Sequence, residues 1–319
     1  MIELKIEEVS KNAIRMFEEI SSVIVGKEDV LELLLASILA NGHVLIEDVP
    51  GLAKTMMARC LASVMACKFS RIQFTPDLLP ADIIGTYVFN QKTGEFYLRK
   101  GPIFANIVLG DEINRAPPKT QSALLEAMQE KQVTIEGETH RLEEPFIVIA
   151  TQNPIEYEGT YPLPAAQMDR FLIRLNIGYP EKEEEVEILK RRISRKSDEF
   201  TLKPVVSAEE VVKMQKAVEE VHVEDSVLEY IVDLVRATRE ASETEVGSSP
   251  RGSLALLKLS RALAAIRGRD YVIPDDVKRV AIPALAHRLI LRREFWYTNV
   301  TQESIVGRLL ETVEVPKFV

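Results

Sequence analysis

The sequence has few cysteines and no long apolar run, and both features exclude classes of protein. No stretch provides the roughly 18 uninterrupted apolar residues of a membrane-spanning helix. The amino-terminal residues MIELKIEEVS are acidic and lack the apolar segment of a signal peptide. Cys60 and Cys67 lie about 10 Å apart if one helix connects them, which is too far for a disulfide. Because unpaired thiols are typical of a reducing compartment, we expect a cytoplasmic protein.

The sequence also has few histidines and no excess of positive charge. The four histidines are scattered and show no spacing typical of a zinc site. The formal net charge is -9, which argues against a surface devoted to nucleic acid. With 319 residues, of which 46% are hydrophobic and 28% charged, the chain is typical of a globular protein with one large or two ordinary domains.

The segment from Asn41 to Cys60, NGHVLIEDVPGLAKTMMARC, predicts a strand, a tight turn and a helix. A turn of this kind exposes main-chain N–H groups at the amino terminus of a helix, where the partial positive charge favours a phosphate group. We expect a nucleotide to contact the residues of the turn and the start of the helix, which are Pro50, Gly51, Leu52, Ala53, Lys54, Thr55 and Met56.

Lys54 is expected to reach the β- and γ-phosphates, and Thr55 to place its hydroxyl on a magnesium ion. The match to the pattern G-x-x-x-x-G-K-[ST] is imperfect, because Asp48 and Ala53 occupy the two glycine positions. Ala53 can follow the loop if its φ is negative, and we expect Asp48 to weaken anion binding unless its side chain turns away. Taken alone, the segment also fits an ordinary strand, turn and helix with a surface lysine.

Polar residues follow two further apolar strands. Asp111 and Glu112 end the strand that begins near Phe104, and acidic residues there sit where α/β sheets bind ligands. Asp111 would hold the magnesium ion and Glu112 would act as general base on the attacking water. Asn153, after the next strand, could orient the same water, although Asn before Pro is also good turn chemistry.

Three further positions suggest nucleotide contacts. Val25 and Gly26 precede the helix that leads into the first strand and could line an adenine pocket, although they also fit a plain turn between helices. Arg170, at the end of a short helix that starts at Pro164, could stabilise charge on a transferring phosphoryl group. A lone arginine more often makes a surface ion pair.

The motifs together resemble the MoxR family of AAA+ ATPases, and the resemblance covers nearly all of the chain. It rests on GLAKT, DEINRAPPKTQSALLEAMQE, IATQNPIEYEGTYPLPAAQMDRF and SPRGSLALLKLSRALAAIRGRDYVIPDDV. The resemblance implies an α/β fold: a P-loop core built as an αβα sandwich, with a parallel five-stranded sheet of order 5-1-4-3-2, followed by an all-helical lid.

The resemblance also implies a role for each matching residue. Lys54 and Thr55 match the Walker A positions, Asp111 and Glu112 match Walker B, and Asn153 matches sensor 1. The remaining two matches are Arg170 with the arginine finger and Arg251 with sensor 2, and Arg251, beside Pro250 at a helix start, would point at the nucleotide. The sequence departs from the family pattern at Asp48, and at Gly252, where alanine is common.

The same resemblance divides the chain into three parts. Residues 1–180 would form the nucleotide-binding core, with a helix-2 insert at about 75–101 and a pre-sensor-1 hairpin at about 131–145. Residues 181–204 would form a charged linker helix, and residues 205–319 the helical lid that carries sensor 2.

We expect a protein that binds ATP and Mg²⁺ and hydrolyses ATP to remodel or mature partner proteins. In family terms it would form a hexameric ring and act on clients such as von Willebrand factor A domain proteins, including insertion of metal cofactors. A nucleic-acid motor is disfavoured, because the hairpin from Gln132 to Leu142 carries two glutamates against one arginine. Two alternatives stay open: a nucleotide-gated binding module with little turnover, and a magnesium-chelatase-like motor subunit.

Overall fold

Five short segments form one parallel sheet in the computed structural model, which describes residues 4–154 and 159–316. From one edge to the other, the strands are β2 (Phe69–Gln73), β5 (Ile107–Asp111), β8 (Ile147–Gln152), β1 (Val44–Glu47) and β9 (Ile173–Leu175). Counted along the chain, this order is 5-1-4-3-2, so the predicted topology is confirmed.

Side chains alternate between the two faces of the sheet. Val44 and Ile46 of β1 join one hydrophobic cluster, whereas Leu45 joins the other. Because successive side chains of a strand point to opposite faces, a strand covered on both faces is apolar at every position. The first cluster contains α1 (Ile6–Ser21), α2 (Glu28–Leu39) and α3 (Lys54–Val64), and the second contains α5 (Pro118–Glu130). The core is therefore an αβα sandwich.

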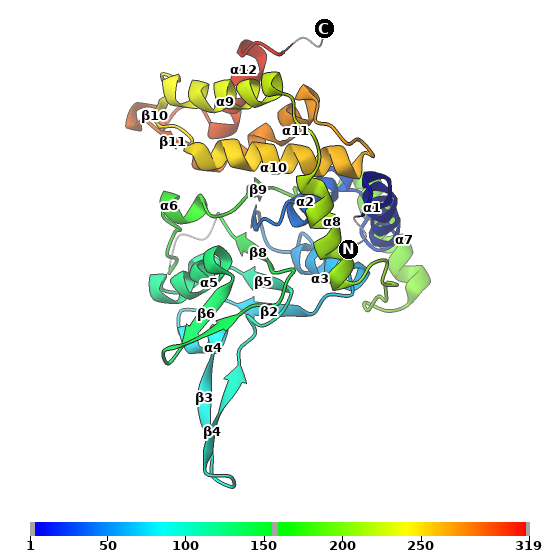
Figure 1. Ribbon diagram of the computed structural model, residues 1–319, viewed down its shortest axis with the longest axis vertical. Coiled ribbons are helices and arrows are strands. Elements are labelled where there is room, and N and C mark those ends of the chain that lie inside the picture. Colours follow the sequence, from blue (N-terminus) through cyan, green and yellow to red (C-terminus); the bar gives the residue numbers. More distant parts are fainter. Residues whose placement is uncertain (1–3, 155–158, 317–319) are drawn as a thin grey trace.

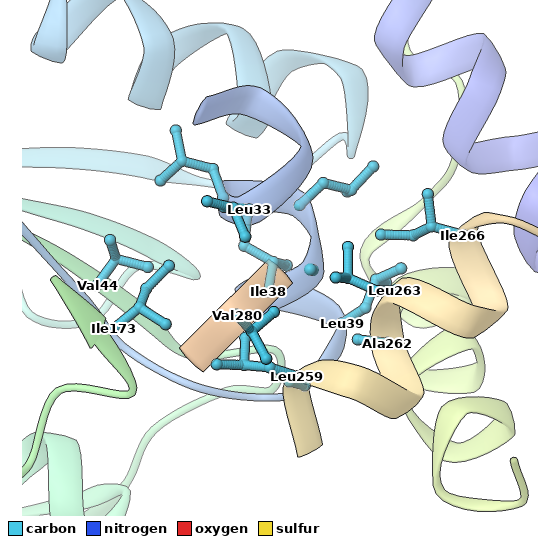
Figure 2. Packing of buried hydrophobic residues seen from close by; sticks show 14 of the residues in the cluster. Leu33, Ile38, Leu39, Val44, Ile173, Leu259, Ala262, Leu263, Ile266 and Val280 are labelled. Carbon is cyan, nitrogen blue, oxygen red and sulfur yellow. The ribbon is translucent and has the colours of Figure 1, made fainter. Parts of the chain in front are cut away.

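The carboxyl-terminal third is helical and shares its core with the sheet. Its helices are α8 (Ala208–Glu219), α9 (Asp225–Glu240), α10 (Pro250–Ile266), α11 (Pro274–Leu285) and α12 (Gln302–Thr312). Figure 2 shows Leu33 and Ile38 of α2 between the strand residue Val44 and the α10 residues Leu259 and Leu263. The helix α2 therefore joins the hydrophobic interior of the sheet to that of the lid.

Two hairpins interrupt the alternation of strands and helices. After α4 (Pro80–Ile84), strands β3 (Gly85–Asn90) and β4 (Glu95–Lys100) form an antiparallel hairpin, and β6 (Gln132–Ile135) pairs with β7 (Glu138–Arg141) in the same way. The β3–β4 hairpin projects from the end of the molecule opposite to α9 and α12 (Figure 1).

The remaining elements are short or connect the larger ones. They are α6 (Ala165–Met168), α7 (Lys182–Arg195), β10 (Thr244–Val246), β11 (Ile290–Leu291) and the 3-10 turns η1 (Ile113–Arg115), η2 (Ala286–Arg288) and η3 (Arg293–Phe295). No helix within residues 4–154 and 159–316 is both long and apolar enough to cross a membrane.

Candidate nucleotide-binding site

A cavity of about 420 Å³ opens where β1, β5 and β8 end and α3 begins. It is lined by Pro50, Gly51, Leu52, Ala53, Lys54, Thr55, Met56, Arg71, Gln73, Asp111, Glu112 and Asn153. Every predicted phosphate-loop residue, both predicted acidic residues and the predicted asparagine therefore lie around one space. The carboxyl ends of parallel strands meet at one edge of a sheet, which explains why these separate segments converge.

The loop between β1 and α3 reverses direction through two left-handed residues. Gly51 has a φ of 90° and Ala53 a φ of 56°, so Ala53 does not meet the condition of a negative φ. Ala53 immediately precedes α3, and the chain enters the helix through this left-handed residue at a cost of about 1–2 kcal/mol for a residue with a Cβ. The first N–H groups of α3 have no intrahelical partner and remain available to a phosphate.

The side chain of Asp48 turns away from this loop. Its Oδ1 accepts the N–H of Val49 at 2.8 Å, and its Oδ2 accepts the N–H groups of Ile177 and Gly178, both at 2.7 Å. The carboxylate thus ties the start of the loop to the segment that follows β9. Its three donors are main-chain N–H groups, so the side chain meets the condition under which no weakening of anion binding is expected.

Lys54 lies half-buried among acidic groups. Its Nζ donates to the main-chain carbonyl of Asp48 at 2.6 Å. Burial lowers the pKa of Lys54, and the carboxylates of Asp48, Asp111 and Glu112 partly oppose this shift because they favour the charged amine. The ammonium group is therefore held at the loop by a single carbonyl and by nearby negative charge.

The two acidic residues at the end of β5 have different partners. Asp111 accepts from the Thr151 hydroxyl at 2.6 Å through Oδ1, and from the Arg71 guanidinium at 2.6 and 3.1 Å through Oδ2. Glu112 accepts through Oε2 from Gln73 and from Arg115, both at 2.9 Å. Glu112 also has a left-handed φ of 56°, which directs the chain into η1.

Arg71 and Gln73 were not predicted as site residues. They alternate with the buried Ile72 on β2, which lies beside β5, and Arg71 also donates to Gln73 at 2.6 Å. The spacing of two along a strand places both side chains on one face. That spacing was the available signal, but it could not show which strand would lie next to Asp111.

The oxygen groups of this cavity suit a magnesium ion. Carboxylates and a hydroxyl are the ligands that Mg²⁺ prefers, and Asp111 and Thr55 supply them here. The guanidinium of Arg71 contacts Asp111 at 2.6 Å, so this carboxylate already faces a positive charge. Asp111 and Thr55 would hold the ion, whose positive charge would offset the negative charge of the phosphates.

Four predicted residues do not line the cavity. Val25 and Gly26 lie outside it, and a Cβ on Gly26 would meet Glu184 of α7 at 2.0 Å. Arg170 instead donates to the main-chain oxygen of Leu125 at 2.9 Å, and it lines a separate cavity of about 260 Å³ between α5 and α6. The short helix ends at Met168, so Arg170 follows it rather than belonging to it.

Arg251 was expected to point at the nucleotide, but it does not line the cavity of its own chain. Its Nη1 lies 3.6 Å from Asp169 Oδ2, and its side chain is half-exposed. The residue stands in the first turn of α10, and the lid brings that turn to the segment carrying Arg170. Gly252 beside it is tightly packed, because a Cβ there would meet Ser248 Oγ at 2.1 Å.

Comparisons with known proteins agree with this geometry. The family described as "ATPase family associated with various cellular activities (AAA)" matches residues 43–173, and "AAA lid domain" matches residues 236–309. "Uncharacterized protein YeaC" of Bacillus subtilis is 52% identical over 94% of this chain and 93% of its own length. "Chaperone MoxR1" of Mycobacterium tuberculosis is 45% identical over 95% of this chain and 82% of its own length.

A solved structure shows the same fold. The crystal structure of a protein from Cytophaga hutchinsonii, assigned as an ATPase, superposes with a TM-score of 0.91 and 43% sequence identity. The superposition covers 97% of this chain and 96% of that one. With a nucleotide cavity built from the phosphate loop and the paired acids, and with these relatives, the chain belongs to the MoxR family of AAA+ ATPases.

Proposed function

We propose that this ATPase uses ATP hydrolysis to remodel or mature partner proteins, and that it does so as a ring, with six subunits as the expected number. The name of the Mycobacterium tuberculosis relative, a chaperone, supports protein clients. Proteins with a von Willebrand factor A domain, and the insertion of their metal cofactors, are the client class and task that we infer from the family. The lid, residues 205–319, would move relative to the core, residues 1–180, through the linker at 181–204.

The observation that carries the catalytic assignment is the single cavity that unites the phosphate loop with the acidic pair. Lys54 and the N–H groups at the start of α3 would bind the phosphates. Glu112 would accept a proton from the attacking water, and Asn153 would orient that water. Thr55 and Asp111 would hold the magnesium ion, whereas Val25 and Gly26 would approach the adenine from the α1–α2 turn.

Glu112 has to change partners before it can act as a base. Its Oε2 already accepts hydrogen bonds from Gln73 and Arg115 at 2.9 Å. Both hydrogen bonds occupy the oxygen that would have to accept the proton of the attacking water. The site as it stands therefore matches a resting subunit, in which Glu112 is stored against β2 and η1.

Neither Arg170 nor Arg251 lines the cavity of its own subunit. Arg251 of the lid lies 3.6 Å from Asp169, the residue that precedes Arg170, whereas the side chain of Arg170 contacts the carbonyl of Leu125 in the core. We propose that both act on the nucleotide of a neighbouring subunit. An arginine supplied in this way is worth about 10³–10⁵ in rate in related phosphoryl transfers.

The experiment is ATP turnover per subunit, with magnesium, over a concentration range that crosses assembly. We expect specific activity to rise by at least about tenfold as rings form. The matched control is Glu112→Gln, which keeps ATP binding but stays near background at every concentration. Constant specific activity in the wild type would contradict the shared site. ATP binding without turnover at any concentration would contradict the motor function and favour the nucleotide-gated module.

A further inference from the structure

The residue that precedes Arg170 is held by the lid. Asp169 Oδ1 accepts from the Nε of Arg288 at 2.8 Å, whereas Oδ2 lies 3.4 Å from the hydroxyl of Ser249 and 3.6 Å from Arg251 Nη1. All three partners belong to the lid: Ser249 and Arg251 stand at the start of α10, and Arg288 ends η2. The carboxylate of Asp169, a core residue, therefore contacts three side chains of the lid.

Arg288 also binds the main chain that follows Arg170 in the sequence. Its side chain is only 3% exposed. Nη2 donates to the carbonyl of Phe171 at 2.7 Å, and Nη1 lies 3.2 Å from the carbonyl of Leu172. The same guanidinium is anchored in its own element, because Nη1 also donates to the carbonyl of Ala284. The planar fork of donors thus connects the end of α11 to the residues that flank Arg170 on both sides.

Burying the guanidinium of Arg288 costs free energy unless its hydrogen-bond and charge partners stay in place. Burial lowers the pKa of Arg288, and the carboxylate of Asp169 opposes that shift. A buried guanidinium is tolerated only where a carboxylate and carbonyls satisfy its charge and its N–H groups. Movement of the lid that retains this arrangement has to carry the backbone of residues 169–172 with it.

The side chain of Arg170, in contrast, rests on the core. Its Nη1 donates to the carbonyl of Leu125 in α5 at 2.9 Å, beside the acidic side chains of Glu126 and Glu130 that line the same small cavity. The main chain around Arg170 is therefore bound to the lid, whereas its guanidinium is bound to helix α5 of the core. A shift of the lid would change the distance between the main chain of Arg170 and the carbonyl of Leu125. Such a shift can break the hydrogen bond between the Arg170 guanidinium and that carbonyl.

We propose that Arg288 and Asp169 are positioning residues that couple the lid to Arg170, so that the state of the lid in one subunit decides whether its arginine reaches the nucleotide of the next. This inference rests on the proposed action of Arg170 on a neighbouring subunit. Neither residue lines the nucleotide cavity of its own subunit. Both act through the main chain on either side of Arg170.

The test is complementation between two defective subunits. Arg288→Met leaves its own cavity intact, because no residue of that cavity contacts Arg288, but it misplaces Arg170. We expect turnover of this variant alone to fall about 100-fold, the loss typical of a catalytic group displaced by about 1 Å. Glu112→Gln has a dead cavity but a correctly placed Arg170. In a random equimolar mixture, about one interface in four pairs an intact cavity with an intact arginine, so turnover should return to about a quarter of the wild-type value.

Two reference mixtures separate this inference from the proposed function. Arg170→Ala mixed with Glu112→Gln should recover in the same way, because it tests only whether the site is shared. Arg288→Met mixed with Arg170→Ala should not recover, since both lack a placed arginine. Absence of recovery in the first reference mixture would overturn the shared site itself. If turnover recovers in the mixture of Arg170→Ala with Glu112→Gln but not in the mixture of Arg288→Met with Glu112→Gln, the positioning role alone is overturned.

Further variants distinguish positioning from general damage to the lid. Arg288→Lys should restore part of the turnover, and Asp169→Asn should reproduce the complementable loss with less disturbance of the fold. The matched control is Arg269→Met, which breaks another lid contact, with Asp276 at 2.6 Å, away from residues 169–172. Binding of a fluorescent ATP analogue should stay within about twofold of wild type in Arg288→Met. A complementable loss of equal size in Arg269→Met would overturn the proposal.

Discussion

Asp48 shows how one carboxylate can serve a phosphate site without facing the phosphates. It occupies a glycine position of the phosphate-loop pattern, yet its oxygens accept three main-chain N–H groups, from Val49, Ile177 and Gly178. The carbonyl of the same residue receives Lys54. Its side chain therefore fixes the frame of the loop, and its main chain holds the lysine.

We predict that Asp48→Ala lowers both stability and nucleotide affinity. The substitution leaves three N–H groups without their acceptor, two of them partly buried, at a cost of about 2 kcal/mol in the free energy of unfolding. Affinity should fall because the loop loses its anchor, although a negative charge has been removed. Urea unfolding and titration with a fluorescent ATP analogue measure the two effects, with Asp48→Asn as an intermediate control. Tighter ATP binding by Asp48→Ala would mean that the carboxylate faces the phosphates.

Individual residues differ in how far the sequence predicted them. Lys54, Thr55, Asp111, Glu112 and Asn153 follow local patterns, and the structure brings them around one cavity. The sequence did not reveal the left-handed φ of Ala53, because an alanine usually avoids that region and the geometry is set by the entry of the chain into α3. The catalytic roles of Lys54, Glu112 and Asn153 remain proposals.

At the scale of elements, α12 is fastened to the sheet by a charged bridge. Arg174 of β9 contacts Glu47 of β1 at 3.0 Å and also donates to Glu303 in the first turn of α12. The side chain of Arg174 is 14% exposed, whereas that of Glu303 is 41% exposed. The carboxyl-terminal helix is thus connected to the strand that leads into the phosphate loop.

A double-mutant cycle should reveal this bridge. We expect Glu303→Gln and Arg174→Gln to show a coupling of about 1 kcal/mol in the free energy of unfolding, since the pair is only partly buried. Arg174→Gln should cost more than Glu303→Gln, because it also removes the cation that faces Glu47. Arg308→Gln is the control, since Arg308 joins the same helix to Glu243 within the lid; its loss should add to that of Arg174→Gln. Zero coupling between Glu303 and Arg174 would contradict the bridge.

The hairpins were visible from turn residues, but their direction was not. Gln91 to Gly94 predicts a turn, and β3 and β4 do flank it. Cross-strand contact between Phe89 and Phe96, with ring centroids 5.1 Å apart, stabilises the hairpin although both rings are largely exposed. Its projection away from the lid depends on how α4 packs against α5, a contact between distant segments (Figure 1).

At the scale of the whole molecule, buried histidines make stability depend on pH. His43 Nδ1 accepts the N–H of Val148 at 3.0 Å, and its Nε2 faces the carbonyl of Met128 at 2.9 Å. Burial lowers the pKa of His43 to about 4, and Lys131 contributes in the same direction. Burial likewise lowers the pKa of His287. The folded protein therefore keeps these rings neutral where the unfolded chain would protonate them.

We predict that stability falls as the pH drops from about 6.5 towards 4, because in that window the unfolded chain binds more protons than the folded one. The contribution of His43 amounts to about 3 kcal/mol across the window. Urea unfolding at several pH values should show a smaller loss in His43→Gln, whereas His222→Gln, which changes an exposed histidine, should follow the wild type. Equal pH slopes in His43→Gln and wild type would contradict the assignment.

Local pattern was sufficient for much of this protein. Strand and helix periodicity, the phosphate-loop spacing and the acids that end β5 depend on residues close in the chain, and they identified the phosphate-loop and acidic residues of the cavity. The family resemblance supplied the fold and the sheet order. Tertiary structure decided what depends on distant segments meeting: Arg71 and Gln73 reaching the acidic pair, Asp48 turning to the segment after β9, and Arg251 joining Asp169 instead of its own cavity. Each of these contacts joins residues from separate elements, and side-chain direction at such a meeting is set by packing rather than by local sequence.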